Sequence, residues 1–187
     1  KPKKFSFVEL GPGNGAFCKT FCRALKKFPE FEKSVKIYLL ERSEKLIQIQ
    51  KSIIKNKNVN WVKNLDKIKD GPILFFGNEF FDSVPIKQYY FKESNIYEKF
   101  IYFKNNKFKK FVFKKVPKKT IKTLKELSLI RKKGVIEYPK KGLQILELIT
   151  KKINKLNGGI LLIDYGYIKA QGKDTLQSLK SHKKNIF

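Results

Sequence analysis

The segment 7–15, Phe-Val-Glu-Leu-Gly-Pro-Gly-Asn-Gly, constrains the fold of this chain more than any other. Glu9 ends an apolar run, and Gly11, Gly13 and Gly15 then alternate through a tight turn that leads into a helical pattern. Glycines permit unusual dihedrals and a close ligand approach, and a helix start adds unpaired N–H groups and a partial positive charge. The pattern therefore predicts a strand, a cofactor-binding turn and a helix.

The spacing within this turn distinguishes between cofactors. Dinucleotide enzymes normally carry G-x-G-x-x-G and bind a pyrophosphate, whereas this loop is G-x-G-x-G with Glu9 two residues before it. A carboxylate beside the loop suits a ligand with an amino group and no phosphate, such as the methionine part of S-adenosylmethionine. Glu41 ends the second predicted strand, where a carboxylate can accept both ribose hydroxyls in NAD enzymes and methyltransferases alike. Taken together, the three features predict an S-adenosylmethionine site.

The hydrophobic pattern alternates between strands and helices along the chain. Apolar runs predict strands at 5–10, 35–40, 59–62, 72–76 and 160–163. Helical spacing predicts helices over 17–28, after Ser43, over 121–127 and over 143–156. This order predicts an α/β fold, a mostly parallel sheet with helices on both faces and a buried fifth strand.

The stretch 86–116 has a different character, because aromatic residues alternate there with Lys and Glu around a turn-like Asn105-Asn106. We interpret it as an antiparallel β-rich insertion after strand four, within a single domain that spans residues 1–187. The chain contains no methionine, its first strand begins almost at residue 1, and no terminal element precedes Phe187. We therefore expect native segments to be missing at both ends.

The net charge of +27 raises the question of a nucleic-acid partner. Only three of the 43 basic residues are Arg, and the lysines are spread along the whole chain. Specific nucleic-acid sites favour Arg, so the charge does not by itself indicate such a partner, and an acidic protein partner is an alternative. No apolar run approaches the ~20 residues of a membrane span.

Cys18 and Cys22 are the only cysteines, and they lie four residues apart on one face of a predicted helix. This spacing does not favour a disulfide, and two thiols with no nearby His make no complete zinc site. We expect buried thiols in a reducing compartment and no metal.

Acidic and amide side chains follow strand four at Asn78, Glu79 and Asp82. Ligands of open α/β sheets bind beyond the carboxyl ends of the strands, and paired carboxylates match the planar fork of a guanidinium. Glu79 is the first candidate for substrate contact, Asp82 the second, and Asp164 after the fifth strand the third. A structural interpretation is also open, in which Glu79 caps a turn and Asp82 pairs with a surface Lys.

Two further residues bear on the same site. Asn64, after the third predicted strand, is a candidate for contact with adenine, and the single histidine, His182, is interpreted as solvated and not as a catalytic base. Methyl transfer from a sulfonium is an in-line displacement that needs no metal, so the enzyme mainly supplies alignment and a group that accepts the nitrogen proton.

Four segments resemble the MidA family: 9–15 (Glu-Leu-Gly-Pro-Gly-Asn-Gly), 78–85 (Asn-Glu-Phe-Phe-Asp-Ser-Val-Pro), 162–167 (Leu-Ile-Asp-Tyr-Gly-Tyr) and 174–177 (Asp-Thr-Leu-Gln). The resemblance implies a class I methyltransferase fold of the Rossmann-like type, S-adenosylmethionine as methyl donor and a protein arginine as acceptor. The family includes a mitochondrial enzyme that assists assembly of respiratory complex I, so a peripheral-arm subunit of complex I is the implied partner. The implied location is the bacterial cytoplasm or, alternatively, the mitochondrial matrix. Asn14 and Lys173 depart from the family pattern.

Three hypotheses for the function follow. The first is a protein arginine methyltransferase, in which Glu79 and Asp82 matter for methylation and not for cofactor binding. The second is a methyltransferase acting on nucleic acid or a small molecule, for which an Asn-Pro-Pro-Tyr-like motif or an Arg-rich face would be expected, and neither is visible. The third is a non-catalytic assembly factor, which predicts that Glu79→Ala leaves assembly intact.

Overall fold

The structure is a computed structural model that describes residues 4–92, 95–105, 107–130, 134–166, 168, 172–180 and 183–185. The chain divides into two compact units, Lys1–Val84 with Gly142–Gly166, and Pro85–Lys141 with Tyr167–Phe187. The second unit contains the predicted insertion and also the segment that follows Gly166. A single domain over the whole chain stays a prediction.

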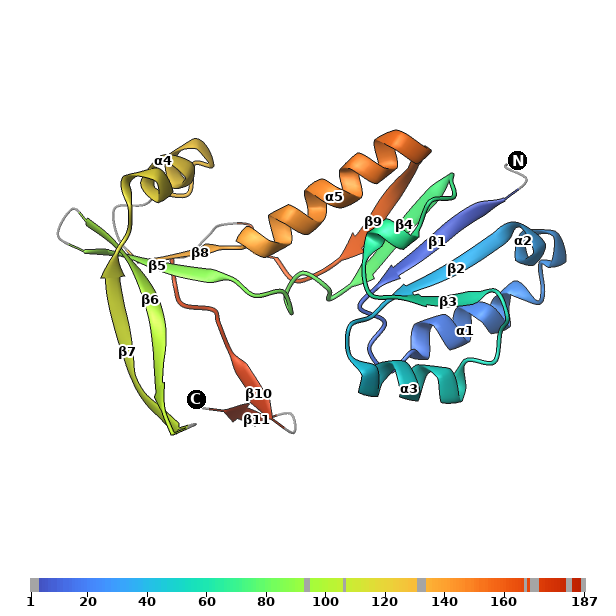
Figure 1. The fold of residues 1–187 in the computed structure, drawn as a ribbon, viewed down its shortest axis with the longest axis horizontal. Coiled ribbons are helices and arrows are strands. Elements are labelled where there is room, and N and C mark those ends of the chain that lie inside the picture. Colours follow the sequence, from blue (N-terminus) through green and yellow to red (C-terminus); the bar gives the residue numbers. More distant parts are fainter. Residues whose placement is uncertain are drawn as a thin grey trace. The chain divides into compact units, whose positions relative to one another are not determined.

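A five-stranded parallel sheet forms the centre of the first unit (Figure 1). Its strands are β1 (Phe5–Leu10), β2 (Val35–Leu40), β3 (Val59–Val62), β4 (Ile73–Asn78) and β9 (Gly158–Ile163). They lie in the order β3-β2-β1-β4-β9, and every pairing is parallel. The strand order reverses beside β1, so the carboxyl ends of β1 and β4 flank the switch point at which ligands of such sheets bind. The predicted mostly parallel α/β sheet is confirmed.

Helices cover both faces of this sheet. They are α1 (Ala16–Leu25), α2 (Pro29–Ser34), α3 (Glu44–Ile53), the short 3-10 helix η1 (Leu65–Lys67) and α5 (Lys140–Leu156). Neighbouring residues of β1 point to opposite faces: Phe7 packs with Cys18 and Cys22 of α1, whereas Val8 packs with Ile149 of α5. None of the described helices is long and apolar enough to cross a membrane.

Local signals account for the helix boundaries. Ser43 caps α3 as predicted, since its hydroxyl oxygen accepts the backbone N–H of Leu46. Helix α2 was not predicted, because a proline at position 29 favours the end of the preceding helix. In the structure Pro29 opens α2, a position where its missing N–H costs no hydrogen bond.

The fifth strand corrects one expectation. It was predicted to be buried, but Leu161 and Ile163 of β9 are 55% and 51% exposed. The reason is its position: among the described strands β9 pairs only with β4 and forms the edge of the sheet. An apolar composition alone does not separate a central strand from an edge strand.

The two thiols of α1 behave as predicted from their spacing. Cys18 and Cys22 are both buried and free, and their Sγ atoms lie 3.9 Å apart. The hydrogen bond to Cys22 and burial both raise the pKa of Cys18 above its usual range. The pair therefore contributes to packing between α1 and the sheet.

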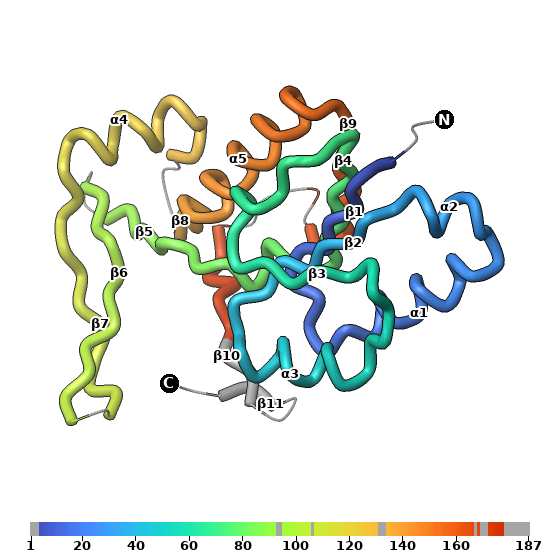
Figure 2. Tube along the Cα trace, turned by 45° about the vertical axis from the view of Figure 1, so that its right-hand side comes forward, coloured from blue at the N-terminus to red at the C-terminus, as the bar shows by residue number. Residues whose placement is uncertain are grey.

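The second unit is built on an antiparallel sheet in the order β7-β6-β5-β8 (Figure 2). Its elements are β5 (Lys87–Lys92), β6 (Asn95–Lys104), β7 (Lys107–Lys115), α4 (Lys118–Glu126) and β8 (Val135–Tyr138), with β10 (Ser178–Lys180) and β11 (Lys183–Asn185) forming a separate two-stranded sheet. The β5-β6-β7 meander confirms the predicted antiparallel stretch, while β8 was not predicted. The core of the second unit is formed by Tyr89, Ile96, Val116, Leu124 and Ile136.

Candidate functional site

The glycine-rich turn lies at the carboxyl end of β1, and all three of its glycines have positive φ. A Cβ on Gly11 would approach the ring of Phe80 to 2.9 Å, and one on Gly15 would approach Ile54 and Gln50 to 3.0 and 3.1 Å. A Cβ on Gly13 would meet nothing within 4 Å. All three positions favour glycine by their positive φ, and crowding by the protein further excludes a side chain at Gly11 and Gly15. Gly13 instead leaves open space in which a ligand can approach the backbone.

This difference makes a testable pair of substitutions. We expect Gly13→Ala to lower the free energy of unfolding by about 1 kcal/mol, the cost of a left-handed alanine. Gly15→Ala should cost more, about 2 kcal/mol or above, because the methyl group must also displace two buried side chains. Urea denaturation of the two variants measures the difference, and equal losses would contradict this account of the turn.

Glu9 is a buried carboxylate at the end of β1, with only 5% of its surface exposed. Its Oε2 atom is buried and has no hydrogen-bond partner among the described residues. Burial, reinforced by the nearby Cys22 thiol, raises the pKa of Glu9 to about 7. Buried polar atoms are normally paired, so an orphaned acceptor beside a glycine turn fits a ligand that brings an ammonium group.

The pKa of Glu9 gives a pH dependence with a definite sign. Because this pKa is raised, the free protein holds Glu9 protonated below pH 7, and binding an ammonium must release that proton. We expect affinity for S-adenosylmethionine to rise about tenfold between about pH 5.5 and pH 7, a range over which the ligand's own amino group stays protonated. Glu9→Gln should bind more weakly, with a flat profile over this range. Calorimetry at the two pH values measures both, and a flat profile for the unsubstituted chain would contradict the assignment.

Glu41 directly follows β2 and is held by its surroundings. Its Oε1 accepts the backbone N–H groups of Arg42 and Ser43, both at 2.8 Å, and its Oε2 lies 3.4 Å from the Nε2 donor of Gln50. Only 9% of the residue is exposed. A carboxylate fixed in this way at a strand end can accept ribose hydroxyls without further ordering.

The two predicted amide contacts are less constrained. Asn64 follows β3 and precedes η1, and Asn78 is the last residue of β4. Both side chains are exposed at carboxyl ends of strands of the sheet. This placement is compatible with the predicted contacts to the cofactor, which stay predictions.

The three predicted acidic residues meet where β4 and β9 end. The Asp164 Oδ2 atom accepts the backbone N–H groups of Phe81 and Asp82 at 3.0 and 3.3 Å. The backbone N–H of Glu79 donates to the Ile163 carbonyl at 2.8 Å. The turn that carries Glu79 and Asp82 is therefore tied to the end of β9, and Asp164 serves as its anchor.

Charge and strain both concentrate in this acidic turn. Partial burial and the neighbouring Asp164 and Glu79 raise the pKa of Asp82, and the Glu79 carboxylate raises the pKa of Tyr165. Glu79 also has a positive φ of 50°, which a non-glycine residue adopts only at a cost. A bound cation would relieve the repulsion between these clustered carboxylates, and a guanidinium is a cation whose planar fork fits paired carboxylates.

Two residues that contact the candidate site were missed from the sequence. Phe80 packs its ring over Gly11, so the acidic turn touches the glycine turn. Gln50 is fully buried and hydrogen-bonds to Gly13, Glu41 and Trp61. A signal for Gln50 was present, since a polar residue occupies the apolar stripe of α3 between Ile47 and Ile54.

His182 lies outside the described residues, and among those described no three His, Cys, Asp or Glu side chains group as a metal site.

Comparisons with known proteins show the family to which this chain belongs. A family model described as S-adenosyl-L-methionine-dependent methyltransferase matches residues 1–187. The mitochondrial protein arginine methyltransferase NDUFAF7 homolog of Caenorhabditis elegans is 28% identical over 96% of this chain and 47% of its own length. The chain thus spans about half the length of the curated relatives it matches.

Two solved structures from Burkholderia thailandensis share the fold. One, an uncharacterised protein, has a TM-score of 0.64 at 17% identity over 89% of this chain and 44% of its own. The other was solved with bound S-adenosyl-homocysteine and has a TM-score of 0.60 at 18% identity over 89% of this chain and 43% of its own.

The family match places the chain in a family of S-adenosylmethionine-dependent methyltransferases, and the sheet order is the Rossmann-like one of this class. S-adenosylmethionine is the methyl donor of this class. Within it, the chain belongs to the MidA family.

Proposed function

We propose that this protein transfers the methyl group of S-adenosylmethionine to an arginine of a protein substrate. The observation that carries the proposal is the acidic turn, in which Glu79, Asp82 and Asp164 gather at the ends of β4 and β9. The pKa of Asp82 is raised by partial burial and its acidic neighbours, so a cationic acceptor would relieve their repulsion. The name of the Caenorhabditis elegans relative supports an arginine acceptor.

The residues at the end of β1 and β2 would hold the cofactor. Glu9 supplies the unpaired acceptor for the ammonium, the backbone at Gly13 allows close approach, and Glu41 accepts the ribose hydroxyls. Asn64 and Asn78 would complete the site. When bound, the cofactor supplies an electrophilic methyl group.

The acidic turn would supply the acceptor chemistry. Glu79 and Asp82 bind the guanidinium and turn one nitrogen lone pair toward the methyl carbon. The new N–C bond forms as the C–S bond breaks, which leaves S-adenosyl-homocysteine, and a carboxylate of the turn takes the proton released from nitrogen. Asp164 stays hydrogen-bonded to the backbone and keeps the turn in place.

A transfer assay tests the proposal. The chain is incubated with methyl-labelled S-adenosylmethionine and a peptide that contains arginine, and a matched peptide with lysine in place of arginine is the control. We expect mass spectrometry to find label on the arginine peptide only. Label on the lysine peptide, or no label on the arginine peptide, would contradict an arginine acceptor.

The physiological target belongs to the same proposal. A subunit of the peripheral arm of respiratory complex I is the acceptor that the family resemblance implies, and the relative's name as a mitochondrial protein agrees with the matrix alternative. The non-catalytic assembly factor is the second candidate function. It is favoured if Glu79→Ala supports complex I assembly in cells as well as the unsubstituted protein does.

A further inference from the structure

Gln50 of α3 is the one fully buried polar side chain of the described residues that contacts several parts of the cofactor site at once. Its Nε2 donates to the Gly13 carbonyl at 2.7 Å and lies 3.4 Å from the Glu41 Oε2 atom. Its Oε1 accepts the indole N–H of Trp61, in β3, at 2.9 Å. The nitrogen and the oxygen of this amide are therefore both engaged.

The bond to Gly13 fixes the direction of one peptide group in the turn. The Gly13–Asn14 peptide is trans, so the N–H of Asn14 points opposite to the Gly13 carbonyl, away from Gln50. With φ of 54°, Gly13 is free to rotate more than other residues, and no side chain within 4 Å of its Cβ position restrains it. The turn around Gly13 and Asn14 is closed by the backbone N–H of Gly15, which donates to the Pro12 carbonyl at 2.8 Å. The amide of Gln50 adds the side-chain restraint on the Gly13 carbonyl itself.

The aliphatic part of Gln50 restrains the same turn by packing against its last glycine, Gly15. A Cβ on Gly15 would lie 3.1 Å from the Gln50 Cγ atom, so this side chain packs directly under the last glycine. The same amide also steadies Glu41, whose other oxygen is held by two backbone N–H groups. One side chain thus links the methionine end and the ribose end of the proposed cofactor site.

We propose that Gln50 is a positioning residue for S-adenosylmethionine, which sets the Gly13–Asn14 peptide and the Glu41 carboxylate before the cofactor arrives. The proposal rests on the cofactor site described under the proposed function. Trp61 is the only tryptophan of the chain, so its fluorescence reports on this hydrogen-bonded network.

The test compares binding of S-adenosyl-homocysteine by calorimetry in the unsubstituted chain and three variants. Gln50→Leu keeps the approximate size of the side chain and removes its hydrogen bonds, so we expect binding at least about tenfold weaker than in the unsubstituted chain. Gln48→Leu, an exposed residue of the same helix, is the matched control and should bind within about twofold. Trp61 emission should change on binding in the unsubstituted chain and not in Gln50→Leu.

The third variant, Gln50→Glu, separates positioning from a purely structural role. At about pH 8 the carboxylate that it introduces cannot donate to Gly13 and faces Glu41, so binding should be at least about tenfold weaker than in the unsubstituted chain at the same pH. At about pH 5.5 the introduced side chain is protonated and can donate again, so the deficit should shrink severalfold. A deficit that does not change with pH, or Gln50→Leu binding within about twofold, overturns the proposal. Failure of the unsubstituted chain to bind overturns the cofactor site itself.

Discussion

Glu79→Gln is expected to reduce methyl transfer to arginine by at least about 100-fold, the usual contribution of a positioned acid–base group. The substitution keeps the size of the side chain but removes the charge that would bind the guanidinium and accept its proton. Affinity for S-adenosyl-homocysteine should stay within about twofold, because Glu79 is proposed to contact the acceptor and is not among the residues proposed to hold the cofactor. Single-turnover transfer and calorimetry measure the two quantities separately.

The matched control is Glu147→Gln, which changes an exposed glutamate of α5 that pairs with Lys151. This variant should transfer methyl groups at the rate of the unsubstituted chain. If Glu79→Gln lost cofactor affinity and transfer to the same extent, the acidic turn would belong to the cofactor site and not to the acceptor site. Unchanged transfer would remove Glu79 from the chemistry.

Glu41→Ala should weaken binding of S-adenosylmethionine about 100-fold, which corresponds to about 3 kcal/mol of lost charge-assisted hydrogen bonds. Two effects add, since the ribose hydroxyls lose their acceptor and the backbone N–H groups of Arg42 and Ser43 lose theirs. Calorimetric titration measures the change.

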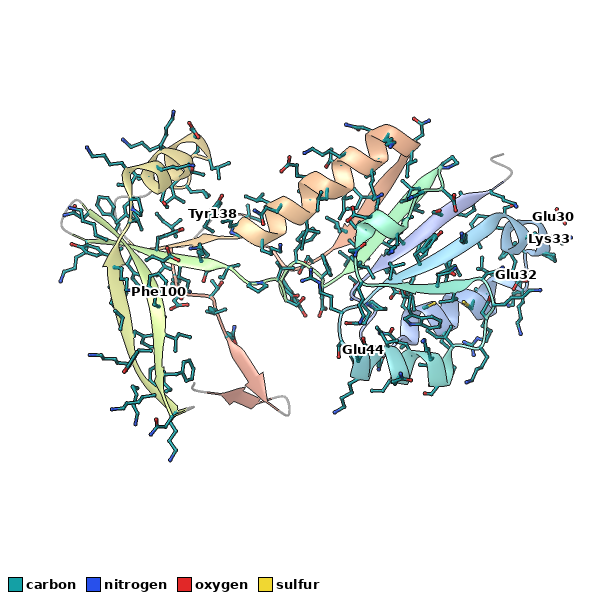
Figure 3. The ribbon with its side chains drawn as sticks, in the orientation of Figure 1. Glu30, Glu32, Lys33, Glu44, Phe100 and Tyr138 are labelled. Atoms are coloured by element: carbon teal, nitrogen blue, oxygen red, sulfur yellow. The ribbon has the colours of Figure 1, made fainter. Side chains whose placement is uncertain are left out.

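Glu44→Ala is the control for Glu41, because it removes an exposed carboxylate a short way further along the chain. Figure 3 shows Glu44 at the start of α3, and its ion pair is with Lys63. Exposed ion pairs contribute little, so we expect this variant to bind within about twofold of the unsubstituted chain. Comparable losses in both variants would indicate a non-specific effect of charge and not a ribose contact.

The sequence predicted the parts of the fold that follow from local patterns. The runs 5–10 and 35–40 agree with β1 and β2, and Ser43 caps α3, because apolar runs and caps are properties of a few neighbouring residues. The exposure of β9 was not predictable in this way, since it depends on which strand lies beside it. Strand β8 is short and pairs with the distant β5, so its pattern alone was too weak.

The same distinction holds for the candidate site. Glu9, Glu41 and the glycines were predicted because they lie at strand ends in a recognisable order. The role of Asp164 as an anchor of the acidic turn was not, because its partners Phe81 and Asp82 are 83 and 82 residues away in the chain. Gln50 was missed because glutamine is usually exposed, although its place on the apolar stripe of α3 between Ile47 and Ile54 was a signal for its burial.

The position of the acidic turn at β9 has a consequence for how the proposed cofactor site and the proposed acceptor site respond to denaturant. Glu9 and Glu41, which are proposed to hold the cofactor, lie on or directly after strands that have neighbours on both sides. The acidic turn is instead hydrogen-bonded through Ile163 and Asp164 to the edge strand of the sheet. Edge strands open more readily than central ones, so mild denaturant should release the amides of Phe81 and Asp82 to hydrogen exchange before those around Gly13. Under the proposed function, acceptor binding is then the first property to fail, and the chain still binds its methyl donor after it has lost the means to use it.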